Sequence, residues 1–229
     1  MRVLVIAAHP DDEILGCGAT VARLVTEGHE VEFAILGEGM TSRHANRADA
    51  EASKIAGLHR QAHLAAARLG VKNLSLHGLP DNRLDTVPLL DVVKIVEGLV
   101  DKLRPEIIYT HHAGDLNVDH GIVHRAVLTA TRPVAPQPVR EIYAFEVPSS
   151  TEWAFQRLEP VFRPTVFVDV SRTLEAKIAA MECYATELRP FPHPRSPEAL
   201  RAIAMRWGSV AGFAAAEAFE LVRSLRSLS

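Results

Sequence analysis

Hydrophobic strand-like segments alternate with helical segments along most of this chain, and this alternation limits the folds available to it. The first segment, residues 2–8, is an apolar, β-branched run typical of strands buried on both faces. A helical pattern follows it and ends at Gly28, and the same succession is repeated further along. Repeated β–α–β units favour a mainly parallel sheet with helices on both faces. We therefore expect a single-domain, Rossmann-like, doubly wound α/β fold.

The expected elements follow from hydrophobic periodicity and from glycine and proline stop signals. Strands are expected over residues 2–8, 29–36, 73–77, 106–110, 140–147 and 165–170. Helices are expected over residues 13–27, 47–69, 89–103 and 120–131, and from a cap at Ser171 to about residue 188. A proline-rich loop over 189–197 and two closing helical stretches complete the chain. The polar loop that begins at residues 37–41 is a candidate lid over the same edge of the sheet.

Length and composition exclude several classes of protein. A chain of 229 residues suits one domain, because single cores stop growing beyond ~250–300 residues. Lys and Arg number 25 against 28 Asp and Glu, without a basic block, so nucleic acid is not an expected partner. The two cysteines, Cys17 and Cys183, cannot form a disulfide framework. No apolar run reaches the ~18 residues of a membrane span, so we expect a soluble cytoplasmic protein, with a homo-oligomer left open.

A dense group of ionisable residues follows the first strand directly. His9, Asp11, Asp12 and Glu13 lie within five residues, and Pro10 restricts the backbone between them. Burying these groups unpaired would be costly, whereas histidine and aspartate are natural ligands of a divalent cation. The alternative is that Asp11 and Asp12 cap the following helix. Capping accounts for the acids but not for His9 beside them.

The topology predicts where the other half of such a site should lie. In a doubly wound sheet, ligands bind beyond the carboxyl ends of the strands, where the strand order reverses. For the common order 3-2-1-4-5 this point lies between the first and fourth strands. The loop after the expected fourth strand carries four histidines and two aspartates: His111, His112, Asp115, Asp119, His120 and His124. Together the two clusters predict a metal site.

The spacing leaves two ligand sets open. His120 and His124 are four residues apart near a helix start, so both could face one metal ion. Alternatively, His120 joins His9 and Asp12 in a set of two histidines and one carboxylate, which serves hydrolytic zinc or, less commonly, oxidative iron. In that arrangement Asp119 would orient a ligand ring or cap the helix.

His9-Pro10-Asp11-Asp12-Glu13, followed by Gly16-Cys17-Gly18, resembles the Ala-His-Pro-Asp-Asp-Glu signature of the LmbE-like, or PIG-L, N-acetylglucosaminyl deacetylases. The resemblance continues at Arg60, Leu79-Pro80-Asp81, Asp119-His120, Pro192-His193-Pro194-Arg195-Ser196 and Ala216-Glu217-Ala218-Phe219. It therefore covers almost the whole chain. It implies a single deacetylase domain over residues 1–229, in which the loop and closing helices of residues 189–229 complete the site.

The resemblance also implies roles for individual residues. His9, Asp12 and His120 would hold one Zn²⁺ per chain, and metal-bound water would attack the amide of an N-acetylglucosamine-type sugar or glycoconjugate. Asp11 would act as the general base, a contribution of roughly 10²–10⁴-fold. Contacts to the sugar are expected from three polar residues, namely Arg60, Asp81 and Arg195.

One departure from the family's usual pattern affects proton transfer. The family has His-x-Asp-His, whereas this chain has Asn117-Val118-Asp119-His120. Asn117 can donate a hydrogen bond to an oxyanion but cannot deliver a proton at neutral pH. His193, held between two prolines, is the first candidate for the group that protonates the amine, and His112 is the second.

Two other functions are compatible with parts of the sequence. A thiol-conjugate amidase or an esterase would use the same metal centre. A nucleotide-binding Rossmann module would share the fold, but it requires Gly-x-Gly-x-x-Gly after the first strand. The acids at that position here would repel a pyrophosphate rather than bind it.

Overall fold

The computed structural model describes residues 1–43, 46–49, 51–134 and 136–226. In these residues seven strands form one sheet in the order β3-β2-β1-β4-β5-β7-β6. They are β1 (Arg2–Ala7), β2 (Glu30–Gly37), β3 (Asn73–Leu79), β4 (Ile107–His111), β5 (Glu141–Phe145), β6 (Val166–Asp169) and β7 (Ala216–Ser224). The first five are parallel, and β7 runs antiparallel to both β5 and β6. The expected strand order 3-2-1-4-5 and the mainly parallel α/β fold are confirmed.

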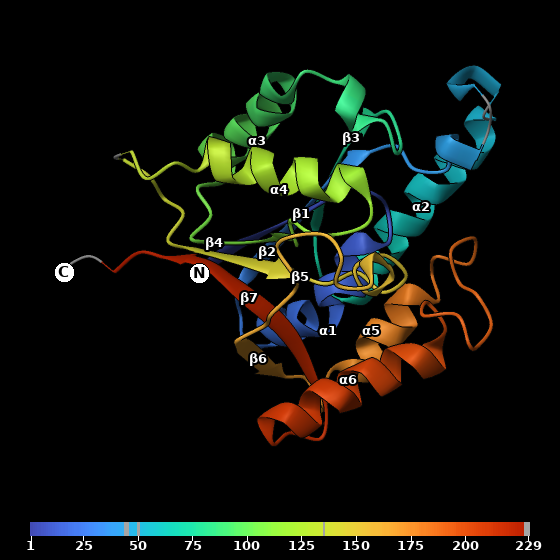
Figure 1. Ribbon diagram of the computed structural model, residues 1–229, viewed down its shortest axis with the longest axis vertical. Helices are drawn as coiled ribbons and strands as arrows, with labels where there is room; N and C mark the ends of the chain where they lie inside the picture. The colour runs from blue at the N-terminus through green and yellow to red at the C-terminus, as the bar shows by residue number, and fades with distance from the viewer. Residues whose placement is uncertain (44–45, 50, 135, 227–229) are drawn as a thin grey trace.

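Helices cover both faces of the sheet (Figure 1). They are α1 (Asp12–Thr26), α2 (Ala52–Arg68), α3 (Leu89–Leu103), α4 (Val118–Ala130), α5 (Leu174–Met181) and α6 (Pro197–Ala211). On β1, alternate side chains enter opposite cores: Val3 and Val5 pack in the core beneath α1, α2 and α5, whereas Leu4 and Ile6 pack beneath α3 and α4. Burial on both faces explains why this segment is continuously apolar. None of the helices in the described ranges is long and apolar enough to cross a membrane.

Two of the expected helices differ from their expected bounds by five residues or more at one end. The helix expected from residue 47 begins at Ala52, after a short 3₁₀ turn at Arg47–Asp49. Residues 44, 45 and 50, which fall in the expected loop and helix, lie outside the described residues. The helix expected to reach residue 188 ends at Met181, and turns follow it.

The last expected helical stretch is instead a strand. Alanine and glutamate favour a helix in this segment, but Ala216–Ser224 forms β7 and joins β5 to β6 across the sheet. Its first four residues are buried. The hydrogen bonds available from two strand edges, together with this burial, outweigh the intrinsic helix preference.

A buried ion pair from the C-terminal elements supports a break in α1. Cys17 departs from helical geometry, with φ −145° and ψ 19°. Glu217 on β7 accepts hydrogen bonds from the backbone amides of Ala19 and Thr20, at 3.2 and 2.7 Å. Lys177 on α5 lies 2.6 Å from Glu217, and both side chains are buried. Glu217 thus supplies hydrogen-bond acceptors to two amides directly after the irregular residue.

Candidate metal centre

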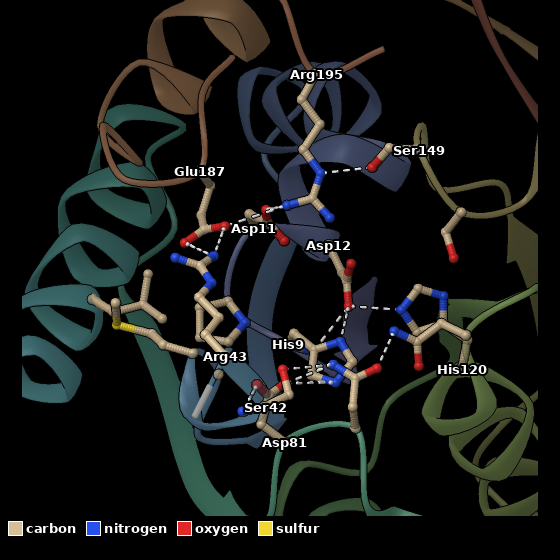
Figure 2. A pocket seen from close by; sticks show the side chains of 17 residues that line it. His9, Asp11, Asp12, Ser42, Arg43, Asp81, His120, Ser149, Glu187 and Arg195 are labelled. Carbon is tan, nitrogen blue, oxygen red and sulfur yellow. Dashed lines mark hydrogen bonds and ion pairs between the residues drawn. The ribbon is translucent and has the colours of Figure 1, made fainter. Parts of the chain in front are cut away.

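The two clusters meet at the carboxyl ends of β1 and β4, the point where the strand order reverses. His9 follows β1, Asp12 begins α1, and His120 lies in the first turn of α4. All three are buried, and one donor atom from each lies within 4.8 Å of the others. They line one side of a pocket of about 220 Å³ (Figure 2).

The distances between the donor atoms suit a shared cation. Asp12 Oδ2 lies 3.3 Å from His9 Nδ1 and 3.2 Å from His120 Nε2. Ligands that bind one zinc ion at ~2.0–2.2 Å are separated from one another by distances of this size. Neither ring nitrogen of His120 makes a hydrogen bond with a described residue, although the ring is buried. A buried imidazole without a hydrogen bond is accounted for if its Nε2 is a metal ligand.

A further carboxylate lies against the outer nitrogen of each histidine. Asp119 Oδ2 lies 2.9 Å from His9 Nε2, and Asp115 Oδ1 lies 3.2 Å from His120 Nδ1. Asp115 also accepts hydrogen bonds from the hydroxyl groups of Ser150 and Thr151. Such carboxylate–histidine contacts fix the ring orientation and increase the basicity of a ligating histidine. The inner nitrogens therefore face Asp12.

The electrostatics of the group favour positive charge between these side chains. Burial by itself lowers the pKa of His120, but Asp12 and Asp115 outweigh it and raise the value to about 9. Burial likewise opposes ionisation of Asp12, yet the neighbouring histidines hold its pKa well below its usual range. Buried carboxylates require compensating charge. A divalent cation bound by the three donors would supply it.

Asp11 occupies the same pocket but is not one of the three donors. Its backbone is left-handed, with φ 106°, which is unusual for a residue other than glycine. Glu13 stabilises this turn by accepting a hydrogen bond from the Asp11 amide at 3.1 Å, and Tyr184 donates to Glu13 at 2.6 Å. The strained turn directs Asp11 and Asp12 to different partners. Burial raises the pKa of the Asp11 carboxyl well above its usual range, against the opposing effect of Arg195.

The tail of the chain adds an ion network to the pocket (Figure 2). Arg195 Nη1 lies 2.6 Å from Asp11 Oδ2 and 3.4 Å from Glu187 Oε2, while its Nε donates to the hydroxyl of Ser149 at 2.8 Å. Arg43 Nη2 contacts both oxygens of Glu187, at 2.8 and 2.6 Å. The sequence predicted Arg195 at the site but missed Arg43, Glu187 and Ser149. The only available signal was that residues 37–43 follow β2 at the same edge of the sheet.

The comparison with known families agrees with this geometry. Residues 4–131, more than half of the chain, match the family model PIG-L, described as GlcNAc-PI de-N-acetylase. The chain belongs to the PIG-L family. The matched region contains all three donors of the candidate metal centre.

Two curated relatives and one solved structure illustrate the similarity of this PIG-L protein to others. An uncharacterised deacetylase, YaiS, from Escherichia coli K12 is 30% identical over 79% of this chain and 88% of its own length. The 1D-myo-inositol 2-acetamido-2-deoxy-α-D-glucopyranoside deacetylase of Mycobacterium sp. JLS is 29% identical over 89% of this chain and 80% of its own length. The crystal structure of GalB, the 4-carboxy-2-hydroxymuconate hydratase of Pseudomonas putida KT2440, is 20% identical, covers 100% of this chain and 99% of its own, and has a TM-score of 0.76. At that identity the last match shows the fold alone.

Two other predicted residues of the PIG-L protein also line the pocket. Asp81 Oδ1 lies 3.4 Å from His9 Nε2, and its Oδ2 accepts a hydrogen bond from the Ser42 amide at 2.9 Å. Asn117 caps α4, and its Nδ2 donates to Asn82 Oδ1 at 2.9 Å. Both residues therefore hold parts of the pocket wall together.

His193 is not among the described residues that line this pocket. Its Nδ1 accepts a hydrogen bond from the Arg195 amide at 3.1 Å, and its ring packs edge-on against Trp153. This local turn folds the imidazole back onto its own loop and leaves Arg195 as the residue of the motif that enters the pocket. The expected position of His193 over the metal site is thus corrected.

Three further residues singled out in the sequence also lie outside this pocket. Arg60 is exposed on α2 and does not line the pocket. His112 is held by Glu220 and by the carbonyl oxygen of Pro160, both at 2.7 Å. His124 donates from Nδ1 to the His111 carbonyl oxygen at 2.8 Å and does not belong to the group of donors. Of the two ligand sets left open by the spacing, the structure assembles His9, Asp12 and His120.

Proposed function

We propose that this protein is a zinc-dependent hydrolase that removes the acetyl group from an N-acetylglucosamine-type sugar or glycoconjugate. The observation that carries the proposal is the convergence of His9, Asp12 and His120 within 4.8 Å, with Asp11 beside them in one pocket. The chain belongs to the PIG-L family, and both curated relatives described above bear the name of deacetylases. The hydratase with the same fold does not favour a second reaction, because the fold does not determine the chemistry.

The donor set is the basis for assigning zinc, at one ion per chain. Two imidazoles and one carboxylate, with room for further ligands, are typical of catalytic zinc sites. When bound, zinc supplies Lewis-acid polarisation of the amide carbonyl and lowers the pKa of coordinated water to about 7. Asp119 and Asp115 hold the two ligand rings in place.

Asp11 is assigned the role of general base. Its carboxylate lies in the pocket without belonging to the donor set, so it is free to accept a proton from the attacking water. Arg195 fixes its orientation through the contact of 2.6 Å between Nη1 and Oδ2. A base held in place in this way loses little entropy when the reaction begins.

The amine leaving group also requires a proton. His9 and His120 are the histidines among the described residues of the pocket wall, and both are assigned to the metal. We therefore transfer the role of general acid from His193 to Asp11, which returns to the amine the proton that it accepted from water. Asn117 lines the same pocket and is positioned to donate a hydrogen bond to the substrate.

Asp81 and Arg195 remain our candidates for sugar contacts, and Arg43 replaces Arg60 because it lines the pocket. Residues 1–229 would form one deacetylase domain, and the segment 189–229 would complete its site through Arg195. Cytoplasmic location and self-association stay predictions, to be tested by cell fractionation and by solution mass measurement.

The test combines metal analysis with deacetylation of a panel of N-acetylated sugars. His9→Ala and His120→Ala should lose both zinc and activity, because each removes a buried ligand. His124→Ala is the matched control and should retain both. Treatment with a chelator should abolish activity, and added Zn²⁺ should restore it. Full activity in a zinc-free His120→Ala protein would refute the assignment.

A further inference from the structure

A second cavity, of about 710 Å³, lies beside the metal pocket. The segment that follows β5, the loop around Pro192 and α6 form its walls. Its lining is mainly apolar and includes four aromatic rings: Phe155, Phe162, Phe191 and Trp207. Phe155 and Phe191 are 75% and 64% exposed. We call this cavity the apolar groove.

The groove and the metal pocket adjoin along a wall that two chain segments form, residues 148–151 and 194–195. Pro148 and Thr151 line the groove, while Ser149 and Ser150, between them in sequence, line the metal pocket. Likewise, Pro194 lines the groove and the next residue, Arg195, lines the metal pocket. Adjacent residues thus face the two cavities from opposite sides of the same backbone.

This wall is also fixed to the metal centre. Ser150 and Thr151 both donate hydrogen bonds to Asp115, whose carboxylate lies against His120. Arg195 ties the other side of the wall to Asp11. A molecule that spans both cavities would therefore meet a rigid junction and not a free loop.

The charged side chains of the groove lining are already engaged. Glu146 accepts a hydrogen bond from the indole Nε1 of Trp207, and the guanidinium of Arg206 lies 4.0 Å from the centre of the same ring. Glu152 accepts from the Ser149 amide at 2.6 Å. The groove thus offers mainly aromatic and aliphatic surface to a ligand, which favours an uncharged, apolar occupant.

The volumes of the two cavities indicate which part of a substrate each one can bind. A pocket of about 220 Å³ is smaller than the ~300–1,000 Å³ typical of drug-sized ligands, whereas 710 Å³ lies within that range. We propose that the metal pocket takes the N-acetylated sugar and that the apolar groove binds an apolar aglycone carried by that sugar. This inference rests on the proposed deacetylase function and names its substrate class: a glycoconjugate with an apolar aglycone.

The test compares the hexyl and methyl glycosides of N-acetylglucosamine. The hexyl compound should have a KM at least about tenfold lower, because only its alkyl chain extends beyond the sugar and can bury apolar surface in the groove. The chain has two tryptophans, Trp153 and Trp207, and the second lines the groove. The hexyl glycoside should therefore change the protein fluorescence saturably, and the methyl glycoside should not. The alkyl chain remains on the product, so this signal does not depend on turnover.

Substitutions then locate the binding surface. Phe155→Ser and Phe191→Ser replace exposed rings and should bring the hexyl-to-methyl KM ratio and the fluorescence response toward those of the methyl compound. Phe213→Ser is the matched control: Phe213 is 41% exposed, lies outside the groove lining and should leave the ratio unchanged.

Each outcome separates the two proposals. Equal KM values and no fluorescence response, with deacetylation intact, would overturn the groove inference and leave the function standing. A groove-dependent response without deacetylation of any glycoside would overturn the function alone. A dimer that Phe155→Ser dissociates, without any alkyl preference, would assign this surface to self-association and also overturn the inference.

Discussion

Residues 1–131 supply the three candidate metal donors, His9, Asp12 and His120, together with the carboxylates that orient the two histidine rings. The described residues from 141 onward supply hydroxyl groups that bind Asp115 and the guanidinium that binds Asp11. The first part is a parallel sheet whose strand ends bring reactive groups together. The second part adds β6 and β7 at one edge and contributes Arg195 to the pocket and Lys177 to the core. The candidate metal donors thus lie at the strand ends of the parallel part and in the turns that follow them. The segments after β5 and before α6 hold those turns, through Ser150 and Thr151 on Asp115 and through Arg195 on Asp11.

The largest effect within this comparison is expected from Asp11 itself. Asp11→Asn keeps the size of the side chain, and asparagine tolerates left-handed backbone. It cannot accept a proton, so kcat should fall by roughly 10²–10⁴-fold while bound zinc is retained. Steady-state kinetics and metal analysis on the same preparation measure this, with the exposed Asp85→Asn as control. Turnover near that of the unmodified protein would reduce Asp11 to the ion-pair partner of Arg195.

The next effect should appear in stability and comes from the C-terminal half. Lys177→Met leaves Glu217 buried without its partner, and breaking such a pair costs about 3–5 kcal/mol. Urea unfolding should show this loss. The control is Arg201→Met, which breaks an exposed pair with Glu175 and should cost less than about 1 kcal/mol. If the two variants are equally stable, the C-terminal ion pair does not support α1.

The smallest effect is expected at His193, although its motif places it next to Arg195. The ring packs on Trp153 outside the metal pocket, so His193→Ala should change kcat by less than about threefold, the scale of an ordinary surface substitution. A pH–rate profile should retain both limbs. Loss of the alkaline limb would return the general-acid role to His193 and would place catalysis in both halves of the molecule.

The sequence by itself predicted the parallel sheet and the two clusters that meet at the candidate metal centre. Buried strands have a local apolar pattern, and residues 2–8 and 106–110 could be recognised from it. The rule that ligands bind at strand ends then joined His9 and Asp12 to the loop that contains His120. This prediction needed only local periodicity and topology. The spacing alone did not separate His120 from His124, because which imidazole faces Asp12 depends on how α4 packs.

The tertiary structure alone decided the contributions of the C-terminal part. Residues 216–224 have a helix-favouring composition, and only the edges of β5 and β6 make them a strand. Arg195 and Asp11 are 184 residues apart in sequence, and His193 lies two residues from Arg195 yet does not line the pocket. Local propensity contains no information about such pairs. The burial of a charge and the partner that compensates it are settled only when distant segments pack together.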